Sequence, residues 1–427
     1  MGNRGISRRT FLKFSAGAVA AATMGTPYLS RVAAQDKGTL RVSMWDGPEV
    51  KPQVDEIIQG FTEKFGYSVN SEFTPDSYDT KLLAGLAAGS APDVFLWWNY
   101  PQLIVRDGLQ DLTEFINGSS PLDTSIYFPP VLNVGKKGDS LYGIPKDWTS
   151  RAMFYNKDLF DKAGIPYPTN DWTWTEFVDI AKALTTGDGP DKQYGTYIYN
   201  QQYPLQGYVW SNGGDFISPD GKTATGYLDS PETIEAIDWY MRLQTEHGVS
   251  PTAANQKTLG DQTTLFANGK LGMFDTGIWP LSQFLNTKDL NFGTVLPPKT
   301  DKGKLVTVLH QADWAINPNA TNKDGAWELL KWMTSPRAAA VWGKSGFSLP
   351  AIESVAKDLG FYEDPIRKTF YEAVDYMTTL PWFIRTTNGA EAETEINQAI
   401  QTAFLGQASV EDALKAAAPT VDSILQG

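Results

Sequence analysis

The sequence predicts an α/β protein built from two lobes. Strand and helix patterns alternate over residues 39–98, and the alternation resumes after residue 170. Strands that alternate with helices are typical of sheets with crossover connections. The chain has 427 residues, which suggests about two domains. No low-complexity or proline-rich linker separates the two stretches, so we expect a short connection that is part of the fold.

The amino-terminal segment has the pattern of an export signal. The stretch SRRTFLK at residues 7–13 leads into an almost charge-free run, as in twin-arginine signals. That run is shorter than the ~20 residues that a bilayer-spanning helix needs, and small residues at 32–34 provide a cleavage site. An amphipathic first helix is the alternative, but the segment has no polar face. We predict a signal peptide over residues 1–34, a mature chain that starts near Gln35, and a periplasmic or extracytoplasmic location.

Hydrophobic periodicity defines the elements of the first stretch. Alternating apolar residues predict a strand over residues 39–45. Apolar residues at helical spacing within 54–65 predict a helix, which Gly66 is placed to end. A second strand, a helix and an apolar strand are then expected at residues 67–73, 81–88 and 93–98.

Helix-start signals define the second stretch. Thr173 and Glu176 form a capping box ahead of an apolar helical pattern. Ser230 followed by Pro231 opens another helix. Three tryptophans within helical apolar patterns are assigned to the core: Trp239, Trp327 and Trp332.

Charge narrows the range of ligands. Without residues 1–34 the chain keeps 31 Lys and Arg against 49 Asp and Glu, a net charge of −18. Such a surface repels phosphate backbones and anionic lipid. We therefore expect no nucleic-acid or membrane-surface partner, and an uncharged or cationic ligand is favoured.

Cysteine and histidine usage excludes several kinds of site. The chain has no cysteine, which rules out a disulfide framework, a thiol nucleophile and a lipid anchor on an amino-terminal cysteine. It has two histidines, His247 and His310, too few for a histidine-built zinc site. We expect no cofactor and no metal, and a protein that is not a lipoprotein.

Aromatic residues are the main clue to function. Trp45 ends the first predicted strand, and Trp97 and Trp98 end the third. In an open parallel sheet the carboxyl ends of the strands face the ligand crevice, and adjacent strand residues point to opposite faces. One of the pair should therefore face the cleft, with core packing as the alternative for each. Ring faces beside neutral polar groups suit the C–H surfaces and hydroxyls of a sugar.

The order of motifs resembles that of extracellular solute-binding proteins of sugar ABC importers, of the maltose-binding type. The resemblance covers essentially all of the mature chain. It rests on APDVFLWW, YGIPKDW with MFYNKDLFDKAGI, TWTEFVDIAKAL, SNGGDFI, FANGKLGMFDTGIWPL, FGTVLPP and SVEDALKAAAPTVDSIL.

This resemblance implies a two-lobe periplasmic-binding-protein fold with the ligand in the interlobe cleft. One crossing between the lobes is expected near residues 147–151 and a second near 306–310. The first lobe would comprise residues 35–147 and about 309–350, and the second residues 148–308 and about 351–427. A sugar ligand, the permease subunits of an ABC importer and a monomeric state are also implied.

The strand ends and the resemblance together indicate a set of ligand-binding residues. These are Trp45, Asp46, Gly47, Trp97, Trp98, Asn99, Asp147, Gln201, Tyr203, Trp279, His310, Gln311, Asp313, Trp382 and Arg385. Such proteins commonly have glutamate near the position of Gln201, and a glycine-rich turn where this chain has HQAD at 310–313. Those departures leave the sugar open. For Arg385 a solvated or ion-paired role is the alternative.

Two other functions compete with this one. A carbohydrate-active enzyme would need two positioned carboxylates, and the chain is rich in acids, among them Asp46, Asp147 and Asp313. The charge of −18 also allows a binding protein for peptides or polyamines. Clustered tryptophans with amide neighbours favour the sugar over both, so we expect binding without catalysis.

Overall fold

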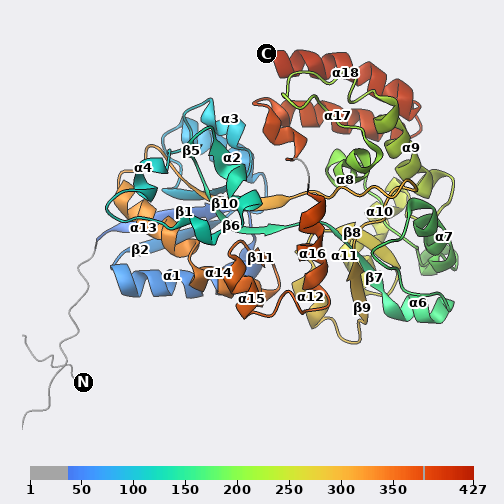
Figure 1. The fold of residues 1–427 in the computed structure, drawn as a ribbon, viewed down its shortest axis with the longest axis horizontal. Coiled ribbons are helices and arrows are strands. Elements are labelled where there is room, and N and C mark those ends of the chain that lie inside the picture. The colour runs from blue at the N-terminus through green and yellow to red at the C-terminus, as the bar shows by residue number, and fades with distance from the viewer. Residues whose placement is uncertain (1–36, 378–379) are drawn as a thin grey trace, which may run out of the picture. The chain divides into compact units, whose positions relative to one another are not determined.

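The first lobe is built on a six-stranded sheet in the order β11-β6-β10-β3-β1-β2 (Figure 1). The computed structural model describes residues 37–377 and 380–427, so the predicted signal peptide and cleavage site lie outside the described residues. β1 is parallel to β2 and β3, and β10 is antiparallel to β3 and β6. The strands are β1 Thr39–Met44, β2 Ser68–Phe73, β3 Val94–Trp97, β6 Ile144–Thr149, β10 His310–Ile316 and β11 Leu349–Pro350.

Helices of this lobe pack on the six-stranded sheet and on one another. α1, α13 and α14 contact one another, and α13 also contacts β3 and β10. Gly66 ends α1 with φ 77°, a left-handed conformation that favours glycine. A short hairpin, β4 Lys136–Lys137 with β5 Ser140–Leu141, lies apart from the sheet. The helices are α1 Lys51–Phe65, α2 Tyr78–Ala87, α3 Tyr100–Ile104, α4 Thr113–Ile116, α5 Pro129–Leu132, α13 Lys323–Met333, α14 Pro336–Ser345 and α15 Glu353–Asp358.

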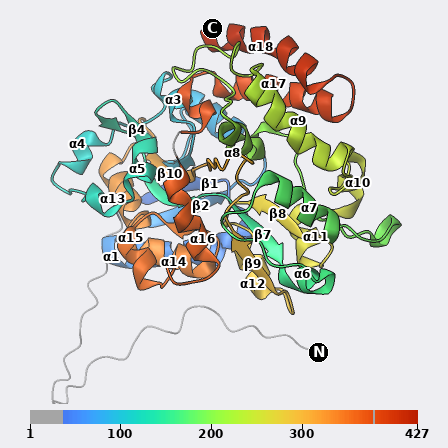
Figure 2. The same cartoon turned by 45° about the vertical axis from the view of Figure 1, so that its right-hand side comes forward.

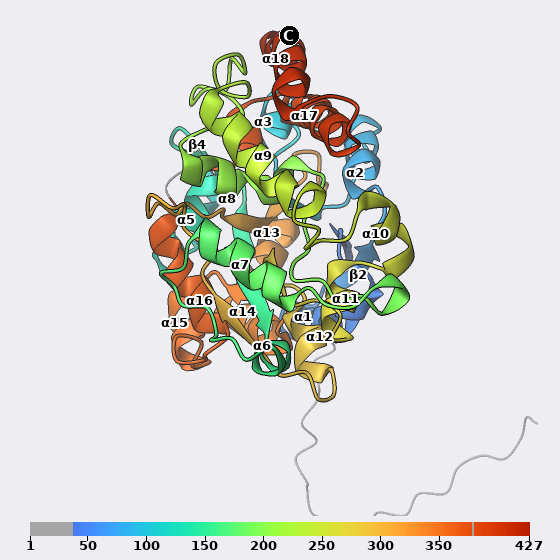
Figure 3. The ribbon, with the colours of Figure 1, turned by 90° about the vertical axis from the view of Figure 1, so that its right-hand side faces the viewer.

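The second lobe has a three-stranded antiparallel sheet in the order β8-β7-β9. Its strands are β7 Ala152–Asn156, β8 Met273–Thr276 and β9 Phe292–Val295. Figure 3 shows α7, α9, α10 and α11 on this side of the molecule. The remaining helices of the described residues are α6 Lys157–Ala163, α7 Trp174–Leu184, α8 Gln202–Asn212, α9 Pro231–Thr245, α10 Ala253–Leu259, α11 Gln262–Ala267, α12 Leu281–Asn286, α16 Arg367–Glu372, α17 Gly389–Phe404 and α18 Val410–Gln426.

Local signals in the sequence set several of these elements. Thr173 and Glu176 form the expected capping box at the start of α7, and the Ser230 side chain accepts from the Thr233 amide at the start of α9. Trp327 is buried. Trp239 is half-buried, with its ring stacked on Trp174 at a centroid distance of 4.0 Å. Trp332 is also half-buried and packs its ring edge-on against Phe65.

The chain passes between the two sheets at several points. β6 ends at Thr149 and β7 begins at Ala152, so Ser150 and Arg151 form one connection. Residues 296–309 form a second, between β9 and β10. The segment from residue 351 was expected in the second lobe. Its first helix, α15, instead contacts α14 and β11 of the first lobe, because the chain packs this helix there before it crosses. The lobe boundaries stay a prediction.

The carboxy-terminal helices return to the second lobe. α17 packs along α18, and these two helices contact α8 and α9 respectively, as Figure 2 shows for α18 and α9. Within residues 37–377 and 380–427, no helix has both the length and the apolar content to cross a bilayer.

Candidate functional site

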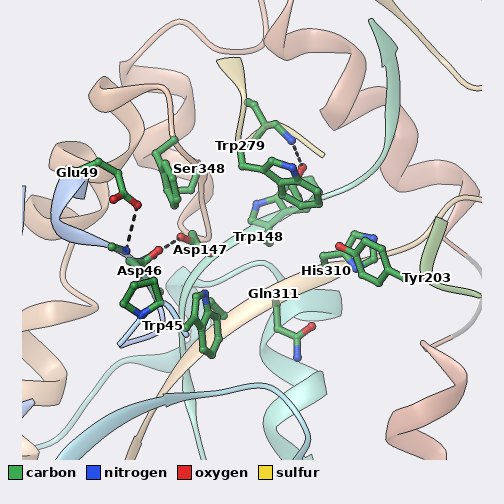
Figure 4. A pocket seen from close by; sticks show the side chains of 17 residues that line it. Trp45, Asp46, Glu49, Asp147, Trp148, Tyr203, Trp279, His310, Gln311 and Ser348 are labelled. Carbon is green, nitrogen blue, oxygen red and sulfur yellow. Dashed lines mark hydrogen bonds and ion pairs between the residues drawn. The ribbon is translucent and has the colours of Figure 1, made fainter. Parts of the chain in front are cut away.

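A cavity of about 400 Å³ opens between residues of the two lobes (Figure 4). The first lobe contributes the carboxyl end of β1 and parts of β6 and β10, together with the residues just before β11. The second contributes the start of α8 and the turn after β8. The lining residues are Trp45, Asp46, Gly47, Glu49, Pro75, Lys146, Asp147, Trp148, Thr149, Tyr203, Ile278, Trp279, His310, Gln311, Ala312, Phe347 and Ser348.

A cluster of charges forms the first-lobe side, and we call Asp46, Lys146 and Asp147 the charged wall. Lys146 Nζ lies 2.9 Å from Asp147 Oδ2 and 3.4 Å from Asp46 Oδ2. Burial raises the pKa of Asp46, and Lys146 opposes that shift. Burial pushes the pKa of Lys146 down, but Asp147 and Asp46 outweigh it, so the pKa is raised. The ammonium therefore stays charged between the two acids.

Glu49 shapes the edge of this wall. It lies in the 3-10 turn Pro48–Val50, directly after β1, and its Oε1 accepts from the Gly47 amide at 3.0 Å. Its side chain is exposed to solvent. The bond ties Glu49 to the backbone of Gly47, the residue after Asp46, just beyond the carboxyl end of β1.

Aromatic and apolar groups form the opposite side, and we call Tyr203, Ile278 and Trp279 the aromatic wall. The Tyr203 ring lies 4.5 Å from the His310 ring, and the Trp279 ring meets His310 edge-on at 6.1 Å. Tyr203 and Trp279 are partly exposed, like Trp45 across the cavity. A Cβ on Gly277 would lie 2.2 Å from the Trp279 ring. Glycine thus lets this indole fold back against the backbone.

A buried ion pair supports the aromatic wall from behind. Arg151 Nε lies 3.1 Å from Asp275 Oδ1, and its Nη2 donates to the Asp275 carbonyl at 2.7 Å. The guanidinium lies 5.6 Å from the centre of the Tyr203 ring. Burial, and then Arg151, hold the pKa of His310 well below its ordinary value. His310 is therefore a neutral imidazole, and its buried Nε2 has no protein partner among the described residues.

Two hydrogen bonds fix the floor of the cavity. The Ile278 amide donates to Thr149 Oγ1 at 3.0 Å, which joins the second lobe to the last residue of β6. Trp148 Nε1 donates to the Pro350 carbonyl at 3.0 Å. Both side chains belong to the strand that enters the first connection between the lobes. The cavity is thus built around a connection rather than on one lobe alone.

Eight of the fifteen residues expected at the ligand line this cavity. They are Trp45, Asp46, Gly47, Asp147, Tyr203, Trp279, His310 and Gln311. They follow β1, lie on β6 or β10, begin α8, or follow β8. The structure therefore brings together residues that are far apart in the sequence.

The third strand places its tryptophans elsewhere. Trp97 is fully buried in the first-lobe core, and its Nε1 donates to the Asn99 carbonyl at 2.5 Å. Asn99 is buried as well, where it caps α3. Trp98 meets Phe383 edge-on at 5.0 Å and donates from Nε1 to Asp79. β3 is central in the sheet, and neither indole is among the residues that line the cavity.

The other expected residues also have protein partners or face away. Asp313 is fully buried and accepts from the Tyr100 hydroxyl at 2.5 Å. Trp382 is fully buried and donates to Gln202 Oε1 at 2.7 Å. Arg385 makes two bonds to Asp215 at 2.8 and 2.9 Å, the ion-paired alternative. Gln201 precedes α8 with its side chain exposed.

Several residues that line the cavity were not predicted from the sequence, because the ends of the predicted strands do not indicate them. The additional ones are Glu49, Pro75, Lys146, Trp148, Thr149, Ile278, Ala312, Phe347 and Ser348. Lys146 was detectable, because it stands beside Asp147 in the stretch IPKDWT, and a lysine inside a strand needs a carboxylate partner to be buried. Ser348 and Phe347 belong to a segment without a motif.

Comparison with known proteins decides the family. The family of bacterial extracellular solute-binding proteins matches residues 56–369, and the twin-arginine translocation signal matches residues 5–25. The chain belongs to the bacterial extracellular solute-binding proteins. The predicted two-lobe fold, the twin-arginine export and the absence of an enzymatic role are thereby confirmed. The protein is an extracellular solute-binding protein of an ABC transporter.

Relatives match this solute-binding protein over nearly its whole length. A binding protein of Brucella abortus (strain 2308) is 26% identical over 434 residues, 97% of this chain and 99% of the relative. The galactooligosaccharide-binding protein of Bacillus subtilis (strain 168) is 23% identical over 96% of this chain and 95% of its own. An ABC substrate-binding protein of Listeria monocytogenes, solved with cycloalternan, superposes with a TM-score of 0.82 at 25% identity, covering 91% of this chain and 99% of that one.

Proposed function

We propose that this solute-binding protein holds an uncharged carbohydrate in the cavity and delivers it to an ABC importer by closure of the two lobes. The observation that carries the proposal is the pairing of the charged wall with the aromatic wall across one space. Figure 4 shows Trp45, Trp279 and Tyr203 around that space, with Asp46, Asp147 and Gln311 among them.

The chemistry of the two walls suits a sugar. The partly exposed indoles of Trp45 and Trp279 offer apolar faces to pyranose C–H surfaces. Asp46, Asp147 and Gln311 offer acceptors for hydroxyl groups. A volume of about 400 Å³ lies within the range of small-molecule pockets.

The charge balance favours a neutral ligand over a polyamine. Lys146 already lies between the two buried acids, at 2.9 and 3.4 Å. A ligand ammonium would compete for the same carboxylate oxygens. Relatives named for galactooligosaccharide binding and solved with cycloalternan support a carbohydrate as well.

Delivery follows from the lining of the cavity by both lobes. A ligand that touches both walls stabilises the closed arrangement by its differential affinity for that state. The permease subunits of the importer would recognise the closed form, and no chemistry on the ligand is required. We propose that a monomer performs this cycle.

A thermal-shift screen tests the proposal. The mature chain is melted with mono- and oligosaccharides, polyols, polyamines and short peptides. A ligand at one hundred times its dissociation constant adds about 2.7 kcal/mol of stability. We expect a carbohydrate to raise the melting temperature and to be recovered unchanged. A response to polyamines or peptides alone would contradict the proposal.

A further inference from the structure

The Lys146 ammonium lies among two carboxylates and an indole of the protein. Its Nζ faces Asp147 Oδ2 at 2.9 Å and Asp46 Oδ2 at 3.4 Å, and lies 4.1 Å from the centre of the Trp342 ring. Its side chain is 1% exposed. An ammonium has three donors, and these three neighbours surround it. Lys146 therefore acts on a ligand through the two acids.

The bonds to Lys146 also determine which carboxylate oxygens remain for a ligand. Both ion pairs use Oδ2, which leaves Oδ1 of Asp46 and Oδ1 of Asp147 for hydroxyl donors. Two acids this close to one ammonium would repel each other without it, and one would take up a proton. A protonated carboxyl loses acceptor capacity.

We infer that Lys146 is the positioning and specificity-determining residue of this cavity, keeping Asp46 and Asp147 as a pair of ionised acceptors for an uncharged polyhydroxyl ligand and occupying the place that a cationic ligand would take. The inference rests on the proposed function. It adds that the preference for neutral over cationic ligands depends on one buried charge.

The titratable groups around Lys146 come from four elements. Asp46 follows β1, Glu49 lies in the next turn, Asp147 is on β6 and Asp313 on β10. Asp46 is influenced by Lys146, Asp147 and Glu49, and Asp313 by Asp147. His310 is neutral and does not compensate the acids. Removal of the ammonium therefore leaves only acids in this group.

Lys331 provides a matched control. Its Nζ lies 2.9 Å from Glu328 and 5.7 Å from the centre of the Trp327 ring, with the side chain 16% exposed. Like Lys146, it combines an acid with an indole, but it does not line the cavity. Lys331→Met thus removes a comparable cation without touching the proposed site.

The experiment compares Lys146→Met, Lys146→Arg and Lys331→Met by titration calorimetry with the carbohydrate found in the screen and with spermidine. For Lys146→Met we expect at least a tenfold loss of carbohydrate affinity and a gain of spermidine binding. We also expect the pH midpoint of carbohydrate affinity to lie above that of the wild type, because the pKa of Asp46 rises further without the ammonium. Lys146→Arg keeps the charge and should restore neutral-ligand preference. Lys331→Met should match the wild type.

Three outcomes are distinguishable. Should the wild type bind no carbohydrate, the proposed function itself fails. The second outcome is that the wild type binds a carbohydrate and Lys146→Met does so with an affinity within twofold and the same pH midpoint, while it binds no spermidine. That outcome overturns the inference about Lys146. Lys146→Gln, which keeps donors but not the charge, carries the same test if Lys146→Met does not fold.

Discussion

The two walls of the cavity differ in burial and in the chemical groups that they present. The charged wall lies on β6 and just after β1 of the six-stranded sheet, where Asp46, Lys146 and Asp147 are buried and contact one another. The aromatic wall lies on a helix start and a turn of the second lobe, where Tyr203 and Trp279 are partly exposed. The charged wall is rigid and directional, which suits the recognition of hydroxyls. The aromatic wall offers contact area that a ligand can cover when the lobes close.

Residues that stabilise the fold and residues that we propose to contact the ligand therefore differ in their exposure. A fully buried indole contributes to stability whether or not ligand is present. A partly exposed indole at the cavity contributes mainly when a ligand covers it. Single substitutions in each group of residues distinguish the two contributions.

The largest effect is expected for a core tryptophan of the second lobe. Trp172 is 3% exposed, and its Nε1 donates to the Leu296 carbonyl at 2.8 Å. Trp172→Ala should lower the free energy of unfolding by about 3–5 kcal/mol, because it leaves a cavity. Denaturant melts of the ligand-free protein measure this. Carbohydrate affinity, measured well below the melting temperature, should stay near the wild-type value.

The next effect concerns the aromatic wall itself. Trp279→Ala should weaken carbohydrate binding by about 2 kcal/mol or more, the range of a binding hot spot, and should change the ligand-free melt little. Calorimetric titration and melting curves should therefore show lower affinity with unchanged stability for Trp279→Ala, and lower stability with unchanged affinity for Trp172→Ala. If Trp279→Ala destabilised the ligand-free fold as strongly as Trp172→Ala while binding normally, the aromatic wall would be part of the core.

The region behind the charged wall should carry a pH dependence of stability. Burial raises the pKa of Asp313 to about 8, whereas an unfolded aspartate titrates near 3.9. Between these values the folded state holds one proton more, so this group lowers stability as pH rises, by up to about 1.4 kcal/mol per pH unit.

The variant Asp313→Asn isolates that contribution. Asparagine mimics the protonated acid beside Tyr100, so the fall in stability between pH 5 and pH 8 should become shallower. Chemical denaturation at several pH values measures the slope. Trp279→Ala should leave the slope unchanged. An unchanged slope in Asp313→Asn would show that Asp313 is already ionised in the folded protein.

The smallest effect is expected for the glycine beneath Trp279. Gly277→Ala adds a Cβ that would lie 2.2 Å from the indole, so the ring must move from its place. Affinity should fall by about 1 kcal/mol, less than for loss of the ring. Gly85→Ala is the control, since its Cβ would meet atoms no nearer than 3.5 Å. Equal affinities in the two variants would mean that the position of Trp279 does not matter.

Local chemistry in the sequence was sufficient to predict much of the fold. The left-handed Gly66 and the capping box at Thr173 and Glu176 act within a few residues, so their effects can be read from neighbouring positions. The carboxyl end of β1 likewise predicted Trp45, because the carboxyl ends of parallel strands face the ligand crevice, whereas Asp46 was predicted from the family resemblance.

The rest of the site depends on contacts between distant segments. Trp45 and Trp97 both stand at strand ends, yet Trp45 follows β1 and lines the cavity, whereas Trp97 is the last residue within β3 and is 0% exposed. Every residue of β6 is buried, so alternation could not single out Lys146 and Trp148. Ser348 reaches the cavity through the pairing of β11 with β6, which no local pattern encodes.

The most direct test disables both walls at once. Asp147→Asn removes a charged acceptor and Trp279→Ala removes an indole, and the two residues lie on different lobes of the same cavity. Titration calorimetry of the double variant, run well below its melting temperature, with the carbohydrate found in the screen should show at least a hundredfold loss of affinity, which is about 2.7 kcal/mol. An affinity within threefold of the wild type would contradict the placement of the ligand between these walls.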